Sequence, residues 1–178
     1  MKKTIFITGI HGVGKSYYSS RVTGEYEHYT ASTLIKEASL NNITNDSKRV
    51  NDLDENQRVL ISSFRHLRKK SNKTFLFDGH LVLLDNNNKF QKISLDVFKA
   101  FEFTVILLLI DNEQEIYNRI VNRDQKNHFT VNQLYKMQEL EIEHANYVSK
   151  ELGIPLEILD LRKSQAEQLF IDRLSMYI

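Results

Sequence analysis

The chain has 178 residues, which is enough for one domain with a substantial hydrophobic core. Hydrophobic residues make up 41% and charged residues 26%, a composition that is typical of soluble globular proteins and excludes general disorder. The formal net charge is +1, so no overall field favours nucleic acid or a membrane surface. The lack of cysteine excludes disulfides and thiolate metal sites.

Two apolar stretches are too interrupted or too short to act as membrane segments. The stretch that follows the N-terminal lysines is broken by Gly9, His11 and Lys15 before a signal-peptide core can form. The stretch Thr104–Ile110 is far shorter than the ~20 residues that span a bilayer. It predicts instead a central strand of a parallel sheet, and we expect a soluble protein.

The first half of the chain predicts alternating strands and helices from its β-branched runs, apolar periodicity and capping signals. In chain order we expect a strand at Lys3–Thr8, a helix from Lys15 to about Gly24, a strand at Tyr26–Thr30, a helix at Ser32–Leu40, a polar loop at Asn41–Val50, a helix from Asp52 to near Ser71 and a strand at Thr74–Phe77. Asp52 and Glu55 form a capping-box pattern at the start of the last of these helices.

The second half continues this alternation. We expect a hairpin of Leu81–Leu84 and Phe90–Ile93, a helix from Ser94 to Ala100, a strand at Phe103–Ile110, a helix from Asn112 to about Arg123, a helix from Thr130 to Leu152, a strand at Leu156–Leu159 and a final helix capped by Ser164. Gly153 predicts the end of the longest helix. Strands that alternate with helices predict a parallel α/β sheet in one domain, residues 1–178.

The residues GIHGVGKS, at Gly9–Ser16, match the phosphate-loop pattern G-x-x-x-x-G-K-[ST] between an expected strand and an expected helix. Glycines let backbone N–H groups converge on an anion, and the start of the helix adds its positive dipole end. Lys15 can neutralise β- and γ-phosphate charge, and the Ser16 hydroxyl can bind Mg²⁺. We therefore expect an ATP site, in a cytoplasmic protein, formed by Gly9, His11, Gly12, Val13, Gly14, Lys15, Ser16 and Tyr17. His11 occupies a variable position of the pattern, and we expect a bystander there rather than a catalytic base.

A bound Mg·ATP needs an acidic residue at the end of a second core strand. In the residues TFLFDGH, Asp78 follows four strand residues and precedes a glycine, so it is the expected metal partner of Ser16. The alternative is an aspartate that only starts a turn. Asp111 also follows a strand, but its place before Asn112 and Glu115 favours a helix-capping role.

Arg119 and Arg123 are four residues apart and share one side of a helix. Phosphoryl transfer depends on positioning and charge neutralisation, which guanidinium groups over a γ-phosphate provide. We expect them to belong to a short lid, with Asp124 as a partner for one of them. The alternative is a solvated helix end whose cations complement the helix dipole.

The phosphate loop GIHGVGKS, the strand end FLFDGH, LDENQR and RIVNRD before a long helix together resemble the adenylate kinase family, in order over nearly the whole chain. The similarity is greatest to the archaeal-type members with a short lid. It implies a three-layer α/β/α P-loop NTPase fold with a central parallel five-stranded sheet, an acceptor-binding segment at about 30–71 and a lid at about 119–130.

The same resemblance implies roles for individual residues. Lys15, Asp78, Arg119 and Arg123 would form the catalytic set, with Mg²⁺ held near Ser16 and Asp78. Thr33 and His80 would line the acceptor site, Arg162 would lie near the donor base, and Arg49 would hold the acceptor's phosphate. Arg49 is not cleanly in register, and the hairpin LVLLDNNNKFQKI lacks the glycine- and proline-bearing residues that the resemblance implies after FLFDGH.

Three functions are therefore open. The first is transfer of the γ-phosphate of ATP to a nucleoside monophosphate, AMP by default. The second is transfer to a hydroxyl, for which Asp78 or His80 would serve as base. The third is a nucleotide-gated binding protein with slow hydrolysis. GTP-binding switches are disfavoured because the N-K-x-D pattern is missing, and large mechanical ATPases because little room is left for their extra elements.

Two charged clusters have weaker implications. The cluster Arg65, His66, Arg68, Lys69, Lys70 and Lys73 can contact RNA phosphates, but it lacks interleaved aromatic residues and is expected to be a solvated surface. On the long helix, Glu139, Glu141, Glu143 and His144 suggest metal ligation, but their spacing spreads them around the helix, which favours an exposed polar face.

Overall fold

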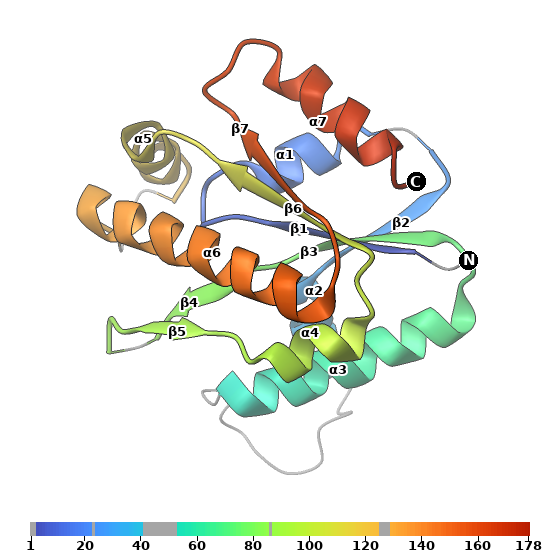
Figure 1. Cartoon of the computed structure of the whole chain (residues 1–178). Coiled ribbons are helices and arrows are strands. Elements are labelled where there is room, and N and C mark those ends of the chain that lie inside the picture. The colour runs from blue at the N-terminus through green and yellow to red at the C-terminus, as the bar shows by residue number, and fades with distance from the viewer. Residues whose placement is uncertain (1–2, 23, 41–52, 86, 125–128) are drawn as a thin grey trace.

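A computed structural model of the chain describes residues 3–22, 24–40, 53–85, 87–124 and 129–178 (Figure 1). Five parallel strands form the central sheet in the order β2-β3-β1-β6-β7. They comprise β2 (Tyr26–Thr30), β3 (Thr74–Asp78), β1 (Thr4–Thr8), β6 (Val105–Ile110) and β7 (Leu156–Asp160). The expected α/β fold with a parallel five-stranded sheet is thus confirmed.

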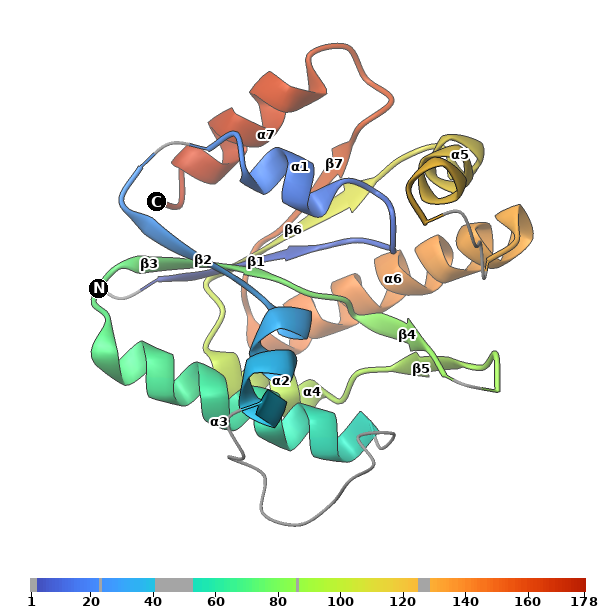
Figure 2. The same ribbon diagram turned by 180° about the vertical axis from the view of Figure 1, so that it is seen from behind.

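Helices cover both faces of this sheet and make the fold three-layered (Figure 1). One layer contains α1 (Lys15–Ser19) and α7 (Ala166–Ser175), and the opposite layer contains α3 (Leu53–Lys70), α4 (Leu95–Phe101) and α6 (Val131–Leu152). Helix α5 (Glu113–Asp124) follows β6, and α2 (Ala31–Leu40) follows β2 and lies beside α3 (Figure 2). Among the described helices, none combines the length and the apolar character that a membrane crossing needs.

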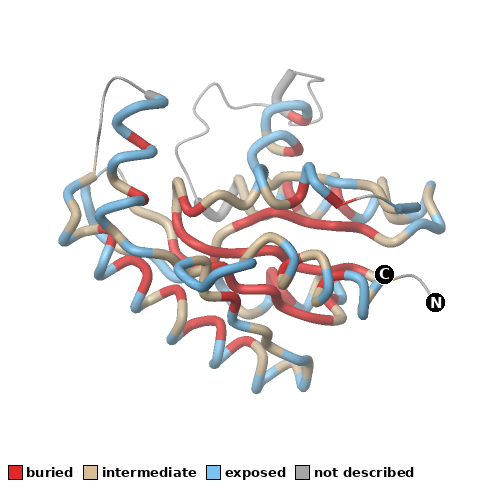
Figure 3. The backbone as a smooth tube through the Cα atoms, turned by 90° about the horizontal axis from the view of Figure 1, so that it is seen from above, coloured by how far each residue is buried: buried red, intermediate tan, exposed pale blue. Residues whose placement is uncertain are grey.

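The alternation of side chains along the strands produces two separate hydrophobic cores. Ile5 and Ile7 of β1 pack in one core with Phe170 of α7, whereas Phe6 packs in the other with Phe98 of α4. Side chains of a strand point alternately to the two faces, so a fully apolar strand supplies both cores at once. Figure 3 shows the result, in which buried residues follow the strands through the middle of the molecule.

A small antiparallel hairpin lies outside the main sheet. Its strands are β4 (Val82–Leu84) and β5 (Phe90–Lys92), with Val82 paired to Lys92. Asp85 closes the turn by accepting hydrogen bonds from the backbone N–H groups of Asn87 and Lys89. The hairpin expected from the sequence is therefore confirmed, and it extends the layer that contains α6 (Figure 1).

Two helix boundaries differ from expectation. Helix α1 ends at Ser19 and not at Gly24, because the chain turns back early to enter the edge strand β2. The start of α7 is not capped by Ser164: Gln165 occupies the N-cap position with a φ of 64° and makes no side-chain capping bond. The polar loop expected at Asn41–Val50 lies outside the described residues.

The long helix α6 has both of its expected ends. Thr130 accepts a hydrogen bond from the N–H of Gln133 at 3.2 Å, and the Gln133 side chain accepts one from the N–H of Thr130 at 2.8 Å. At the other end, Gly153 takes the left-handed conformation with a φ of 64°. These two caps set where α6 begins and ends.

Replacing Thr130 by alanine is expected to lower the free energy of unfolding by about 1 kcal/mol, because a helix N–H loses its acceptor. Chemical denaturation of Thr130→Ala beside the matched control Thr130→Ser measures this loss. The serine variant keeps the hydroxyl and should stay close to the parent protein. Equal destabilisation by both variants would contradict the capping role.

Candidate functional site

The candidate site lies at the carboxyl edge of the sheet, where β1, β3 and β6 end. A cavity of about 420 Å³ opens there between the phosphate loop, the end of β3 and helix α5. Parallel sheets bind ligands at this edge, because the loops that leave the strands converge there. The cavity brings together most of the residues expected from the sequence: His11, Gly12, Gly14, Lys15, Ser16, Tyr17, Asp78, His80, Arg119 and Arg123.

The phosphate loop depends on glycines at two positions in particular. Gly12 has a φ of 81°, and a Cβ atom there would lie 2.5 Å from Cγ1 of Ile120. Gly14 has a φ of 112° and forms the N-cap of α1. Because only glycine adopts such angles without strain, the loop can curve tightly into the start of the helix. A tight glycine turn that leads into a helix is the arrangement in which backbone N–H groups and the helix dipole can bind an anion.

Lys15 folds back onto the loop that carries it. Its Nζ donates hydrogen bonds to the carbonyl oxygens of Gly9, at 2.7 Å, and Ile10, at 3.3 Å. Loss of water around the ammonium group lowers the pKa of Lys15 to about 8, although Glu141 and Asp78 partly oppose this shift. A phosphate would replace these carbonyl contacts and stabilise the charged form of the lysine.

Asp78 and Ser16 supply the oxygen atoms that a magnesium ion prefers. Asp78 is buried at the end of β3, where its Oδ1 accepts a hydrogen bond from Ser19 and its Oδ2 lies 3.1 Å from Nε2 of His28. Ser16 is exposed on α1 and lines the same cavity. Among the described residues no three acidic or histidine side chains form a metal cluster, so an ion here would also need phosphate oxygens.

The two arginines of α5 both reach the phosphate loop. Arg119 donates to Oδ2 of Asp111 and, at 3.4 Å, to the carbonyl of Val13. Nη2 of Arg123 lies 2.9 Å from Nε2 of His11. This positions two guanidinium groups beside the expected phosphates, as transfer chemistry requires.

Asp111 therefore differs from its expected role. Asn112 caps α5, because its side chain accepts hydrogen bonds from the N–H groups of Gln114 and Glu115. Asp111 instead holds Arg119 against the loop. The side chain of Asp124, the partner expected for one arginine, lies outside the described residues.

Glu141 of α6 is fully buried at the site, whereas its sequence pattern favoured an exposed polar face. Oε1 accepts hydrogen bonds from Oγ1 of Thr8 at 2.5 Å, from N of Gly9 at 3.2 Å and from N of Leu81 at 3.0 Å, and Oε2 accepts one from N of Val82 at 2.8 Å. Burial raises its pKa, which these hydrogen bonds and Lys15 partly offset. One carboxylate thus joins the start of the phosphate loop to the turn after β3.

The other three residues of α6 that suggested metal ligation, Glu139, Glu143 and His144, do not share the position of Glu141. Glu139 and Glu143 are exposed, as expected, and Glu143 pairs with Lys92 at 2.8 Å. His144 is buried, contrary to expectation, and its Nε2 lies 2.7 Å from the carbonyl of Ile93. The only sequence signal for burial was the spacing of Leu134, Met137, Glu141 and Ala145 along one side of the helix.

The expected acceptor and base-binding residues are only partly brought together. His80 lines the cavity, whereas Thr33 is exposed on α2 and bonds to Thr30. Arg162 lies outside the cavity lining and makes a two-pronged ion pair with Asp160, with both N···O distances 2.7 Å. Arg49 lies outside the described residues.

His80 is held in its neutral form. Burial lowers its pKa well below the ordinary value, and the nearby charges of Lys15 and His11 act in the same direction. The backbone of Gly9 opposes this shift only in part. The imidazole therefore offers one N–H donor and one unprotonated nitrogen acceptor.

The basic cluster on α3 includes one residue with a structural role. The guanidinium of Arg68 donates to the carbonyl of Lys73 at 2.7 Å and to Oγ1 of Thr4 at 3.2 Å, and it lies 4.2 Å from the centroid of the Phe75 ring. Arg68 thus ties the end of α3 to the sheet and is not a solvated cation as expected.

The lowered pKa of Lys15 predicts a pH dependence of ATP binding. Phosphate oxygens favour the protonated lysine, so affinity should fall as the pH rises from about 7.5 to about 9.5, by up to about tenfold per unit above pH 8. Calorimetric titration of ATP at several pH values measures this. The Lys15→Met variant should bind ATP more weakly, and its affinity should not decline over this pH range. If the affinity of both proteins fell in parallel with pH, the pH dependence would not come from Lys15.

Replacing Glu141 is expected to destabilise the protein strongly. Leucine at this position leaves the buried N–H groups of Gly9, Leu81 and Val82 without an acceptor, which should lower the free energy of unfolding by about 3–5 kcal/mol. Glutamine keeps one oxygen acceptor and should cost about half as much. Chemical denaturation compares Glu141→Leu and Glu141→Gln with Glu139→Gln, an exposed neighbour on the same helix. A small effect of both Glu141 variants would contradict the role of this carboxylate in joining the phosphate loop to the turn after β3.

Comparisons with known proteins agree with this geometry. Among solved structures, the tunicamycin resistance protein of Deinococcus radiodurans has a TM-score of 0.65 at 13% identity, with 99% of this chain and 95% of that chain covered. A sugar kinase from Janibacter sp. HTCC2649 has a TM-score of 0.57 at 15% identity, with 99% of this chain and 94% of that chain covered. TT1252 from Thermus thermophilus has a TM-score of 0.53 at 16% identity, with 98% of this chain and 96% of that chain covered. At such identities the likeness shows a shared fold.

Sequence comparison adds a family. No curated protein matches the chain. The AAA_17 family, described as an AAA domain, matches residues 8–133, which include the phosphate loop, Asp78 and both arginines. This match covers well over half of the chain and agrees with the P-loop fold of the structure, so the chain belongs to the AAA_17 family of AAA domains.

Proposed function

We propose that the protein is an ATP-dependent phosphotransferase that moves the γ-phosphoryl group of ATP to a small molecule. One observation carries this proposal: Lys15, Asp78 and the arginine pair of α5 line a single cavity at the phosphate loop. The sugar kinase that shares the fold supports a transfer function rather than nucleotide binding alone. Because ATP is supplied in the cytoplasm, we propose that the protein acts there.

The donor side of the site needs little rearrangement. The loop N–H groups and Lys15 would bind the β- and γ-phosphates, with Lys15 exchanging the carbonyls of Gly9 and Ile10 for phosphate oxygens. Mg²⁺, when bound near Ser16 and Asp78, neutralises phosphate charge. Arg119 and Arg123 would stabilise the charge that spreads over the transferring group.

The reaction itself requires only one bond to form and one to break. An oxygen of the acceptor forms a bond to the γ-phosphorus, and the bond from that phosphorus to the β–γ bridging oxygen breaks. The bridging oxygen keeps the electron pair and leaves as part of ADP. A phosphate acceptor already carries negative charge, whereas a hydroxyl acceptor also gives up its proton, which Asp78 or the unprotonated nitrogen of His80 would take.

A nucleoside monophosphate, AMP by default, is the acceptor that the resemblance to adenylate kinases suggests. Its phosphate needs a cation on the acceptor side, and Arg49 is the residue proposed for this role. The cations of the described site, Lys15, Arg119 and Arg123, all lie on the donor side.

A hydroxyl acceptor is the second candidate, and one observation favours it. Nδ1 of His80 is buried without a hydrogen-bond partner at the border of the cavity. An unprotonated nitrogen there can accept a hydrogen bond from an acceptor hydroxyl and so orient it.

A coupled ADP-release assay tests the phosphotransferase. We expect ATP turnover to rise when the true acceptor is added and to fall roughly a hundredfold or more in Lys15→Ala, because transition-state charge loses its main counterion. The acceptor panel includes AMP and other nucleoside monophosphates, with Arg49→Ala as the variant that should lose them selectively. Slow hydrolysis that no small molecule stimulates would refute transfer and leave a nucleotide-gated binding protein.

A further inference from the structure

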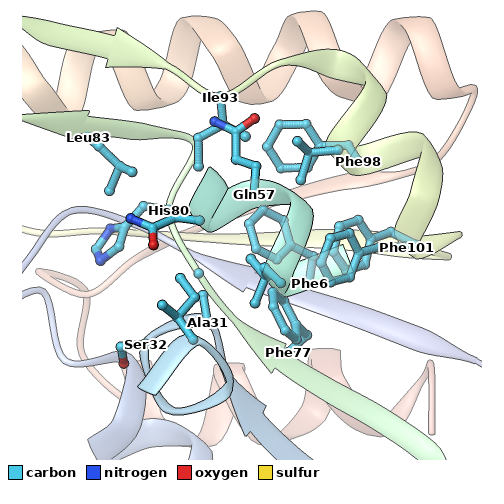
Figure 4. Close-up of a pocket in the computed structure, with 16 residues that line it drawn as sticks. Phe6, Ala31, Ser32, Gln57, Phe77, His80, Leu83, Ile93, Phe98 and Phe101 are labelled. Atoms are coloured by element: carbon cyan, nitrogen blue, oxygen red, sulfur yellow. The ribbon is translucent and has the colours of Figure 1, made fainter. Parts of the chain in front are cut away.

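A second cavity lies next to the phosphate-loop cavity, and the proposed binding of ATP does not account for it. Its volume is about 190 Å³, and its far end is built from phenylalanines that include Phe6, Phe77, Phe98 and Phe101. Figure 4 shows these rings on one side of the cavity, with His80 on the other. None of the described residues that line it is a lysine, arginine, aspartate or glutamate.

The two cavities are continuous in their lining. Both are bordered by Ala31 and Ser32 at the start of α2 and by Gly79 and His80 after β3. Gly79 allows the backbone to pass close to the aromatic wall, since a Cβ atom there would lie 2.8 Å from Cε2 of Phe6. A molecule in the aromatic cavity would therefore present its near end to the phosphate-loop cavity.

Two buried polar atoms of this lining have no hydrogen-bond partner: Nδ1 of His80 and Oδ1 of Asn56. The imidazole of His80 is neutral, so one of its ring nitrogens carries a proton and the other accepts a hydrogen bond. A hydroxyl group can pair with Nδ1 in either tautomer, and it donates to Nδ1 when Nε2 carries the proton. Both unpartnered atoms thus call for a polar group on a ligand, because buried polar atoms are normally satisfied.

We propose that this aromatic cavity is the acceptor subsite and that it binds a small planar ring molecule whose hydroxyl group donates a hydrogen bond to His80. This assignment rests on the proposed phosphotransferase function. Aromatic walls favour a ring through stacked and edge contacts. The cavity is also larger than the engineered cavity of about 150 Å³ in another protein that stays dry and binds benzene.

The same lining disfavours other acceptors. A sugar would bury several hydroxyl groups against phenylalanine side chains without partners, and a phosphate group would meet no cation of the described lining. The hydroxyl of a ring molecule, by contrast, would lie at the His80 end, which is the end that the γ-phosphate site shares.

Binding is tested first without ATP, so that its outcome does not depend on the transfer reaction. Methyl NMR spectra are recorded while benzyl alcohol, toluene or ribose is added, and the signals of Ile93 and Val97 report on the cavity. We expect benzyl alcohol to bind about three- to tenfold more tightly than toluene, since one hydrogen bond is gained, and ribose not to bind. No shift with either ring molecule, or a shift with ribose alone, would overturn the proposal.

Variants of residues in and beside the cavity test whether the ring molecules bind there. Leu83→Trp narrows the cavity and should abolish the shifts, whereas Leu84→Trp, on the other side of β4, should not. His80→Phe should remove the preference for benzyl alcohol over toluene. His80→Asn, which keeps an acceptor atom, should retain it. Equal behaviour of the tryptophan variants, or a preference that persists in His80→Phe, would count against the assignment.

The ADP-release assay then connects the cavity to the reaction. Benzyl alcohol and 2-naphthylmethanol should stimulate ADP release from ATP, and the stimulation should disappear in Leu83→Trp while ATP binding stays unchanged. If the ring molecules bind but AMP is the acceptor that stimulates release, the acceptor subsite is wrong and the phosphotransferase stands. If ATP does not bind at all, the phosphotransferase fails, and the cavity is judged by the NMR titration alone.

Discussion

The buried carboxylate of Glu141 is the interaction on which the site depends. It reaches from α6 across the edge of the sheet and binds donors from two loops, one after β1 and one after β3. A carboxylate is costly to remove from water, and here four hydrogen bonds and the nearby charge of Lys15 offset part of that cost. The relative position of the phosphate loop and of Asp78 therefore depends on a residue that is not part of the cavity lining.

The cations of the site are held by protein groups in a similar way. Lys15 binds loop carbonyls, Arg119 binds Asp111, and Arg123 lies against His11. Each contact keeps a flexible side chain close to where phosphate charge would be, so less ordering is needed on binding. The charges are arranged in advance on one side of the site, between α5 and the phosphate loop.

The acceptor side has the opposite chemistry. Aromatic side chains from the core between the sheet and helices α3 and α4 extend to the edge of the sheet and leave an apolar space beside His80. This follows from β1 and β3 themselves, since the face that carries Phe6 and Phe77 faces α3 and α4. A charged cavity and an apolar cavity thus meet along a shared border that includes His80, where the reacting group of an acceptor would lie.

Local sequence signals determined much of the molecule. Apolar runs, capping residues and glycines depend on neighbouring residues only, so they predicted the order of strands and helices, the ends of α6, the hairpin and the phosphate loop. Asp78 was placed at the site because it ends a second core strand, and the arginine pair because its helical spacing and charge suit phosphoryl transfer. The early end of α1 and the uncapped start of α7 were missed, because the path of the following chain overrides local preference.

Only the tertiary structure decided which polar side chains face one another. Glu141 and Glu143 are two residues apart on one helix, yet one is a buried clamp and the other an exposed partner of Lys92. The sequence around Asp111 favours a helix-capping role, but in the fold this carboxylate pairs with Arg119. The aromatic cavity likewise joins residues from α2, β3, the hairpin and α4, which are far apart in the chain. Periodicity tells that a side chain is on a given face, but its partner depends on how distant elements pack, and that information is not local.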